Sequence, residues 1–166
     1  GAEYVHGLRR GISNRAPIIG PYEVFQSGSG DAYAKGANLL HTVRAILNDD
    51  EQWRQILRGI NADFYHQTVT THQIEQYIND RVPYDLTPVF EQYLRDYRLP
   101  KLEWKREGNT MKYRYTNVIN SFDMPVELLI NGKRFDIQPN PGSWQTVELT
   151  GDNPVVEVDK DYYIQV

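Results

Sequence analysis

The stretch Leu99-Pro100-Lys101-Leu102-Glu103-Trp104 marks the point at which the spacing of the apolar residues changes. Before Pro100 the apolar residues recur every three or four positions, which is typical of helices. After it they alternate with polar residues, which is typical of strands. The sequence therefore predicts an α+β protein, with a helical domain over residues 1–100 and a β domain over residues 101–166.

The N-terminal part is predicted to be a bundle of about four helices. The clearest helix spans Ala32–Asn48, where one apolar stripe is formed by Gly36, Leu40, Val43 and Leu47. Asp31, just before it, is expected to accept hydrogen bonds from the free amide groups of the first turn. Further helices are expected after Asp50, after Thr70 and from Thr87-Pro88 onward, and Gln73 completes a capping-box pattern with Thr70.

About seven short strands are predicted after Lys101. The strongest local signal is Asn131-Gly132, because both residues tolerate the positive φ angles of a tight hairpin turn. The segments on either side, Val126–Ile130 and Arg134–Ile137, are the two strands that this turn is predicted to connect. A small antiparallel β-sandwich accounts best for strands at this spacing.

The composition fits a soluble globular protein, with 40% hydrophobic and 24% charged residues among 166. No apolar run approaches the ~20 residues that a membrane-spanning helix needs. The polar, acidic start Gly1-Ala2-Glu3-Tyr4 does not predict a signal peptide. The absence of cysteine excludes disulfides and thiolate chemistry. The formal charge of −4, without a basic cluster, argues against nucleic acid as a partner.

The four histidines do not form a metallopeptidase motif. H-E-x-x-H would place two imidazoles on one helix face, but His6, His41, His66 and His72 are never four residues apart. His66 and His72 are six apart across a predicted loop, so surface or capping roles are expected for them. His41 is expected to be a helix-packing residue. The sequence thus predicts no metal bound by this chain.

The stretch Tyr33-Ala34-Lys35-Gly36 resembles the Tyr-x-Lys-Gly helix of the aminopeptidase N and leukotriene hydrolase family of gluzincin zinc metallopeptidases. Three further elements resemble the same family in the same order, and together the likeness covers roughly residues 30–105. These elements are Asn48–Trp53, Thr68–Thr71 followed by Ile74, and Asp85–Phe90 leading to Leu99-Pro100.

The resemblance implies a catalytic role for Tyr33. In the family this tyrosine donates a hydrogen bond to the tetrahedral intermediate of peptide hydrolysis, at an active site that contains zinc. The sequence pattern alone favours a different role, in which Tyr33 is an aromatic residue that packs against the core at the start of a helix. The resemblance favours the catalytic reading.

The other parts of the family's active site have no counterpart in this sequence. Its zinc ligands, its glutamate base and the motif that holds a free amino terminus all precede the matching region. The chain is therefore expected to be inactive alone, either as a truncated piece of a parent that binds zinc and a peptide substrate or as part of a non-catalytic relative. A cell-envelope or secreted location follows only from the family.

A second hypothesis is a non-catalytic interaction module that binds protein or carbohydrate. In this hypothesis the β-sandwich would present exposed aromatic side chains, for which the candidates are Trp104, Trp144, Tyr162 and Tyr163. Alternatively, these rings fill the core. Their burial distinguishes the two possibilities.

Overall fold

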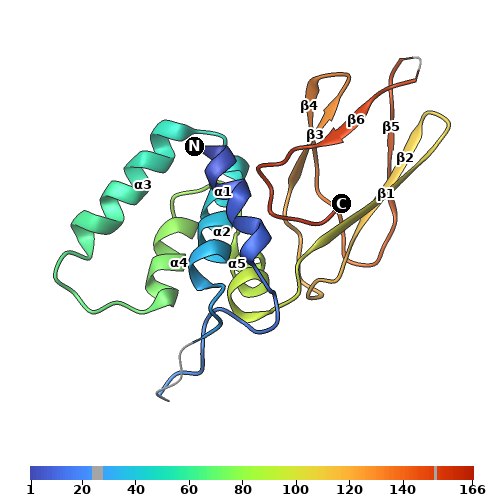
Figure 1. Cartoon of the computed structure of the whole chain (residues 1–166). Coiled ribbons are helices and arrows are strands. Elements are labelled where there is room, and N and C mark those ends of the chain that lie inside the picture. The colour runs from blue at the N-terminus through green and yellow to red at the C-terminus, as the bar shows by residue number, and fades with distance from the viewer. Residues whose placement is uncertain (24–27, 152) are drawn as a thin grey trace.

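The computed structural model describes residues 1–23, 28–151 and 153–166. The helical elements are α1 (Ala2–Leu8), the 3-10 turn η1 (Arg9–Gly11), α2 (Ala32–Leu47), α3 (Asp50–Asp63), α4 (Thr71–Asn79), and α5 (Thr87–Phe90), which continues as the π-helical turn η2 (Glu91–Arg95). No helix in the described ranges has the length and apolar character required to span a membrane. Figure 1 shows the helices on one side of the molecule and the strands on the other.

The strands form two three-stranded antiparallel sheets, with orders β1-β2-β5 and β4-β3-β6. Their bounds are β1 (Lys101–Glu107), β2 (Thr110–Thr116), β3 (Val126–Ile130), β4 (Lys133–Ile137), β5 (Gln145–Glu148) and β6 (Val156–Val158). The predicted α+β class is confirmed. The last predicted strand is reduced to a single bridge between Lys101 and Gln165, so the described residues form six strands rather than about seven.

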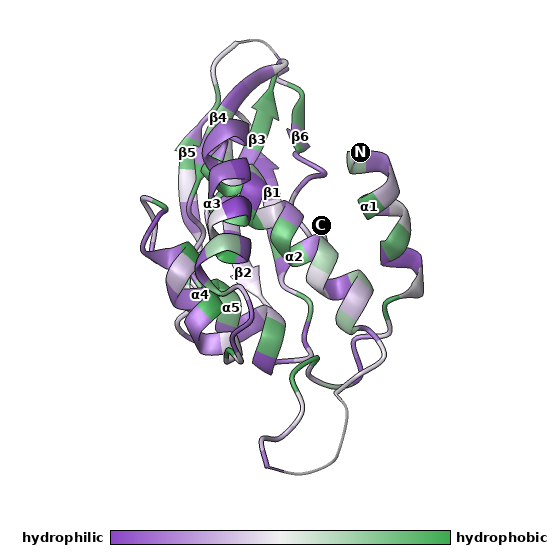
Figure 2. Cartoon of the chain, turned by 90° about the vertical axis from the view of Figure 1, so that its left-hand side faces the viewer, coloured by the Kyte–Doolittle hydropathy of each residue, from purple (hydrophilic) through white to green (hydrophobic). Residues whose placement is uncertain are grey.

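Local sequence signals lie where they were predicted. Thr70 and Gln73 form a reciprocal capping box at the start of α4, and α5 begins at Thr87 with proline in its first turn. Asn131 and Gly132, with φ angles of 51° and 75°, connect β3 to β4. In β2, buried and half-buried residues alternate along the whole strand. In Figure 2 the helices carry bands of both hydrophobic and hydrophilic residues.

The helices and the sheets share one buried cluster. Val43 and Ile78 contribute to it from helices, and Tyr115 and Leu128 contribute from the two sheets. Buried tyrosines also make polar contacts in it, since the Tyr115 hydroxyl donates to the Met124 carbonyl at 3.0 Å. The strands therefore pack against the helical part as well as against each other.

The buried face of α2 differs from the prediction. Val43 is buried as predicted, but Leu40 is 40% exposed and Gly36 is partly exposed. The buried residues of α2 include the polar side chains of Lys35, Asn38 and Thr42. The predicted stripe was wrong for Gly36 and Leu40, although Val43 and Leu47 do pack in or against the core. It counted only apolar residues, whereas the buried side of this helix is partly polar.

Replacing Gly132 by alanine is expected to lower the free energy of unfolding by about 1–2 kcal/mol, because its φ of 75° is unfavourable for a residue with a Cβ. Urea denaturation would measure the change. Gly7→Ala is the control, since Gly7 lies in α1 with open space at the Cβ position. Equal effects of the two substitutions would contradict the assignment of the loss to the hairpin turn.

Candidate functional site

The start of α2 is fixed by a buried lysine. Lys35 is fully buried, and its Nζ donates to the backbone carbonyl of Asp96, just beyond η2, at 3.1 Å. Burial lowers the pKa of Lys35, while the negative charges of Asp31 and Asp96 act in the opposite direction. Arg98 in turn pairs with the Asp96 carboxylate at 2.7 Å. This contact connects the first turn of α2 to the end of the last helical segment.

Tyr33 points away from the body of the chain. Successive residues of an α-helix are rotated by about 100°, so Tyr33 and Lys35 lie on nearly opposite sides of α2. With Lys35 inside, Tyr33 is 92% exposed. Tyr33 therefore does not pack against the core, which was the alternative to a catalytic role.

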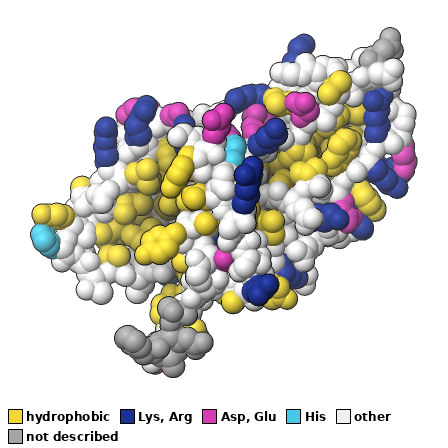
Figure 3. Space-filling view, in the orientation of Figure 1, with side chains coloured by type: hydrophobic (Ala, Val, Ile, Leu, Met, Phe, Trp, Pro, Cys, Tyr) yellow, Lys and Arg dark blue, Asp and Glu magenta, His cyan; other side chains and the backbone are white. Residues whose placement is uncertain are grey.

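Tyr33 belongs to an apolar stripe along α2 in which Tyr33 and Leu40 are exposed and Gly36 and Ala37 are half-buried. Gly36, Ala37 and Leu40 follow Tyr33 at intervals of three and four residues, the spacing of one helix face. A Cβ placed at Gly36 would meet no atom within 4 Å. Figure 3 shows hydrophobic side chains gathered on the surface of the helical part. The space above Gly36 is therefore open. Lys35 is the only charged residue between Tyr33 and Leu40 in the sequence, and its side chain faces inward, so this face of α2 carries no charge there.

Asp31 does not cap the first turn of α2 as predicted, but makes hydrogen bonds to a distant segment. Its carboxylate makes no capping hydrogen bond to the first turn of α2. Instead it accepts from the backbone amides of Ser13 and Asn14 at 3.0 and 2.7 Å and from the Ser13 hydroxyl at 2.9 Å. Burial by itself would raise the pKa of Asp31, but the bonds from Ser13 and Asn14 outweigh it and lower the pKa. The acid therefore connects the start of α2 to the segment after η1.

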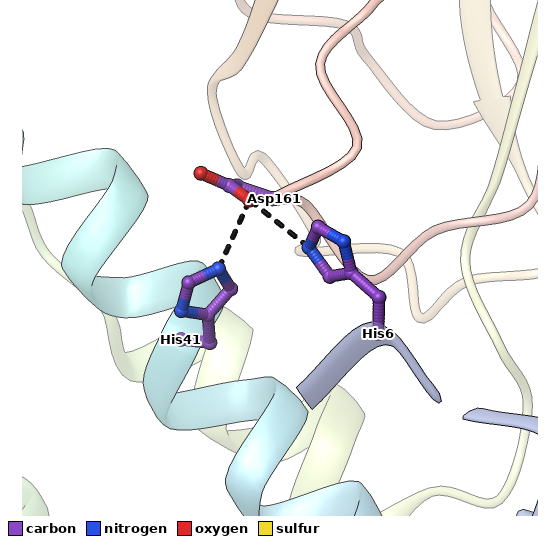
Figure 4. Close-up of side chains that lie close together, drawn as sticks. All are labelled: His6, His41 and Asp161. Carbon is purple, nitrogen blue, oxygen red and sulfur yellow. Dashed lines mark hydrogen bonds and ion pairs between the residues drawn. The ribbon is translucent and has the colours of Figure 1, made fainter. Parts of the chain in front are cut away.

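The histidines divide into two groups. His66 stacks edge-on against Tyr65, with ring centroids 4.1 Å apart, and the His72 side chain is 78% exposed. Neither belongs to a group of three potential metal ligands among the described residues. His41 is buried and packs against the ring of His6 at 5.5 Å, in line with the packing role predicted for it. Both rings also point at Asp161, as Figure 4 shows, and this was not predicted from the sequence.

The acid between the two rings lies in the segment after β6. Asp161 Oδ1 is 3.0 Å from Nε2 of His6 and 3.0 Å from Nε2 of His41. Burial alone would raise the pKa of Asp161, but the hydrogen bond from His41 and the proximity of both histidines lower it. No sequence motif could have revealed this cluster, because its members come from three distant segments.

The aromatic residues proposed for a binding module do not form an exposed patch. Tyr162 and Tyr163 are buried, and Trp104 is partly buried against the core. Trp144 is 42% exposed, and the Arg114 guanidinium lies 4.4 Å from its ring centroid. Of the two possibilities, the core position therefore holds for both tyrosines, and they do not support an interaction module.

The fold is of a kind found in a peptidase. Aminopeptidase A of Legionella pneumophila, whose crystal structure was determined in complex with aspartic acid, matches 82% of this chain with a TM-score of 0.63 and 12% sequence identity. The match covers 18% of the length of that protein. No family model matches the chain, and no match was found among curated proteins. At this identity the likeness shows the fold alone.

Asp31→Asn is expected to lower the free energy of unfolding by about 1–3 kcal/mol at neutral pH. The asparagine amide has only one oxygen, so its NH2 group would face a donor whose hydrogen bond the carboxylate accepts. The folded-state pKa of Asp31 lies below the unfolded value of about 3.9. The carboxylate therefore contributes stability above about pH 4 that is lost as the pH falls through the folded value. Urea denaturation between pH 7 and pH 3 should show a smaller acid-induced loss in the variant; an unchanged acid dependence would contradict this.

Gly36→Ala is expected to raise the free energy of unfolding of this chain by about 0.5–1 kcal/mol, since alanine favours the helix and meets no neighbour. Gly59→Ala is the matched control in α3, where a Cβ would collide with the Tyr77 hydroxyl that donates to Asp63. That variant should lose or reverse the gain. Thermal unfolding would measure both, and a destabilising Gly36→Ala would show that the space above Gly36 is filled.

Proposed function

We propose that this chain is the C-terminal part of a zinc-dependent metallopeptidase of the aminopeptidase type, and that it contributes Tyr33 to an active site completed by the rest of the parent protein. The observation that carries the proposal is the outward position of Tyr33 on the apolar stripe of α2. The likeness of the fold to part of an aminopeptidase supports it. Residues 30–105 contain the sequence elements that resemble the gluzincin family.

The role proposed for Tyr33 is hydrogen-bond donation. When a peptide carbonyl is attacked, its oxygen gains negative charge, and a phenol that is already in place stabilises that charge. The buried Lys35 two residues later provides the rigid support, because it fixes the rotation of α2. Tyr33 itself keeps an exposed side chain that is free to meet a substrate bound to another part of the parent.

This chain does not fit a zinc site of the family's type. The sequence lacks H-E-x-x-H, so the ligands and the general base would have to come from outside these 166 residues. We therefore assign zinc and the peptide substrate to the parent protein. The chain alone is expected to be inactive.

The apolar stripe on α2 is a surface on which another segment of the parent protein could pack. Gly36 and Ala37 have minimal side chains, which permits the backbone of a neighbouring segment to approach α2 closely. Leu40 adds apolar area one turn further along. In the alternative function, a non-catalytic interaction module, the same stripe would contact a separate protein and Tyr33 would be a contact residue.

The test is Tyr33→Phe in the parent protein. The variant is expected to lower kcat about 100-fold or more with little change in KM, because the lost hydrogen bond is made mainly in the transition state. Tyr65→Phe is the control, since Tyr65 is also largely exposed but follows the distant end of α3. Steady-state hydrolysis of amino-acid amides of a chromogenic amine would give both constants.

Two outcomes would contradict the proposal. Unchanged turnover in Tyr33→Phe would exclude the role in stabilising the oxyanion and would favour the interaction module. Hydrolysis by the 166-residue chain alone would exclude the division of the active site between this chain and the rest of the parent.

A further inference from the structure

We propose that His6, His41 and Asp161 form a binding site for a late first-row divalent metal ion, with zinc as the ion to test. The three residues come from α1, from α2 and from the segment after β6, and their ligand atoms all lie within 4.8 Å of one another (Figure 4). The site is independent of the proposed peptidase function, because this chain alone would hold the ion. This proposal differs from the sequence analysis, which predicted that the chain binds no metal.

The distances are close to those of a metal site. In a tetrahedral zinc site with bonds of 2.0–2.2 Å, neighbouring ligand atoms are separated by about 3.3–3.6 Å. Asp161 Oδ1 lies 3.0 Å from each imidazole Nε2. To accommodate an ion, Asp161 Oδ1 would move a few tenths of an ångström away from each nitrogen, and the ligand atoms, which lie within 4.8 Å of one another, would close to about 3.6 Å or less by shifts of up to about 1.2 Å. Two imidazoles and a carboxylate are also the ligand types that zinc and its neighbours in the periodic table accept.

One of the imidazole nitrogens is left unsatisfied without an ion. His41 Nε2 is hydrogen-bonded to Asp161 Oδ1. His6 Nε2 is buried and lies 3.0 Å from the same oxygen, but this contact lacks hydrogen-bond geometry, and no other described residue supplies a partner. Buried polar atoms without a partner are uncommon in folded proteins. A metal ion would bind the lone pairs of both nitrogens and the same carboxylate, so that all three groups would be satisfied together.

The position of Asp161 does not depend on the histidines. Its backbone amide donates to the Asp159 carboxylate at 2.8 Å, and its carbonyl accepts from the Thr42 hydroxyl at 3.3 Å. Thr42 is the neighbour of His41 on α2, and its hydroxyl also accepts from the amide of Tyr163 at 2.9 Å. The backbone of Asp161 is thus held in place by surrounding contacts, which lowers the cost of ordering the site on binding.

The site opens to solvent on one side. A groove of about 240 Å³ is lined by His41 and Asp161, together with Arg44, Asp50 and Arg134 among others. A water molecule could reach the ion there as its fourth ligand. Arg44 is the adverse charge in this groove, but Asp50 pairs with it at 2.7 and 2.8 Å.

A second cation lies near Asp161 on the side of α1. Arg9 is close enough for its charge to interact with that of Asp161, and its guanidinium donates to Asn38 at 2.6 Å. With neutral imidazoles, the Asp161 carboxylate offsets one of the two charges of the ion. We therefore expect the balance of charges to limit the affinity and to favour strong nitrogen ligation over the binding of a hard cation such as Mg²⁺.

The test uses the 166-residue chain without an affinity tag, after removal of metals with a chelator. Calorimetric titration with ZnCl2 near pH 7.5 is expected to show one site per chain, and zinc is expected to raise the Tm, because binding only the folded state stabilises it. MgCl2 should do neither. With Co²⁺ in place of Zn²⁺, visible absorption bands should report nitrogen and oxygen ligation of low coordination number.

The variants assign the site to its residues. His6→Gln and Asp161→Asn should each weaken the affinity for Zn²⁺ at least about tenfold, and circular dichroism would check that they fold. The matched control is the double substitution of His66 and His72 by glutamine, which removes the two other histidines and should leave the affinity unchanged. The proposal is overturned if the wild-type chain shows no saturable zinc binding, if folded His6→Gln and Asp161→Asn bind as tightly as wild type, or if the control variant loses the site.

Discussion

The contact between the Lys35 ammonium and the Asp96 carbonyl is the constraint on which the candidate site depends. Burying a charged amine is costly unless polar partners replace water. Here the Asp96 carbonyl accepts its hydrogen bond, and Asp31 and Asp96 contribute negative charge. The same contact fixes the rotation of α2 about its axis. Tyr33 faces outward because Lys35 must face inward.

Much of the fold could be predicted because its signals are local. The capping box of Thr70 and Gln73 involves residues three apart, and the Asn131-Gly132 turn requires only that two adjacent residues tolerate positive φ. The alternation in β2 likewise depends only on the period of a strand. Such features hold whatever the rest of the chain does, so the sequence was sufficient to predict them.

The contacts that shape the candidate site could not be predicted in this way. On α2, Lys35 is satisfied by Asp96, Asn38 by the Val5 carbonyl and Thr42 by the segment at Asp161, all distant in sequence. A prediction that places only apolar residues in the core gives α2 the wrong orientation about its axis, because the buried face of α2 contains three polar side chains with hydrogen-bond partners. The expectation for Asp31 failed for the same reason, because its donors are seventeen and eighteen residues away.

These polar contacts also explain why only one face of α2 remains open. The contact of Asn38 with Val5 places α1 on one side, Lys35 fixes the end of η2 on another, and Thr42 holds the C-terminal segment through Asp161 and Tyr163. Since each of these contacts has a defined geometry, α2 cannot rotate to hide its remaining side without breaking all three. That side carries Tyr33 and the small residues Gly36 and Ala37. An apolar face that buried polar contacts keep exposed is typical of a surface on which a further segment packs. The stripe, and not the tyrosine alone, therefore supports the proposed place of this chain in a larger peptidase.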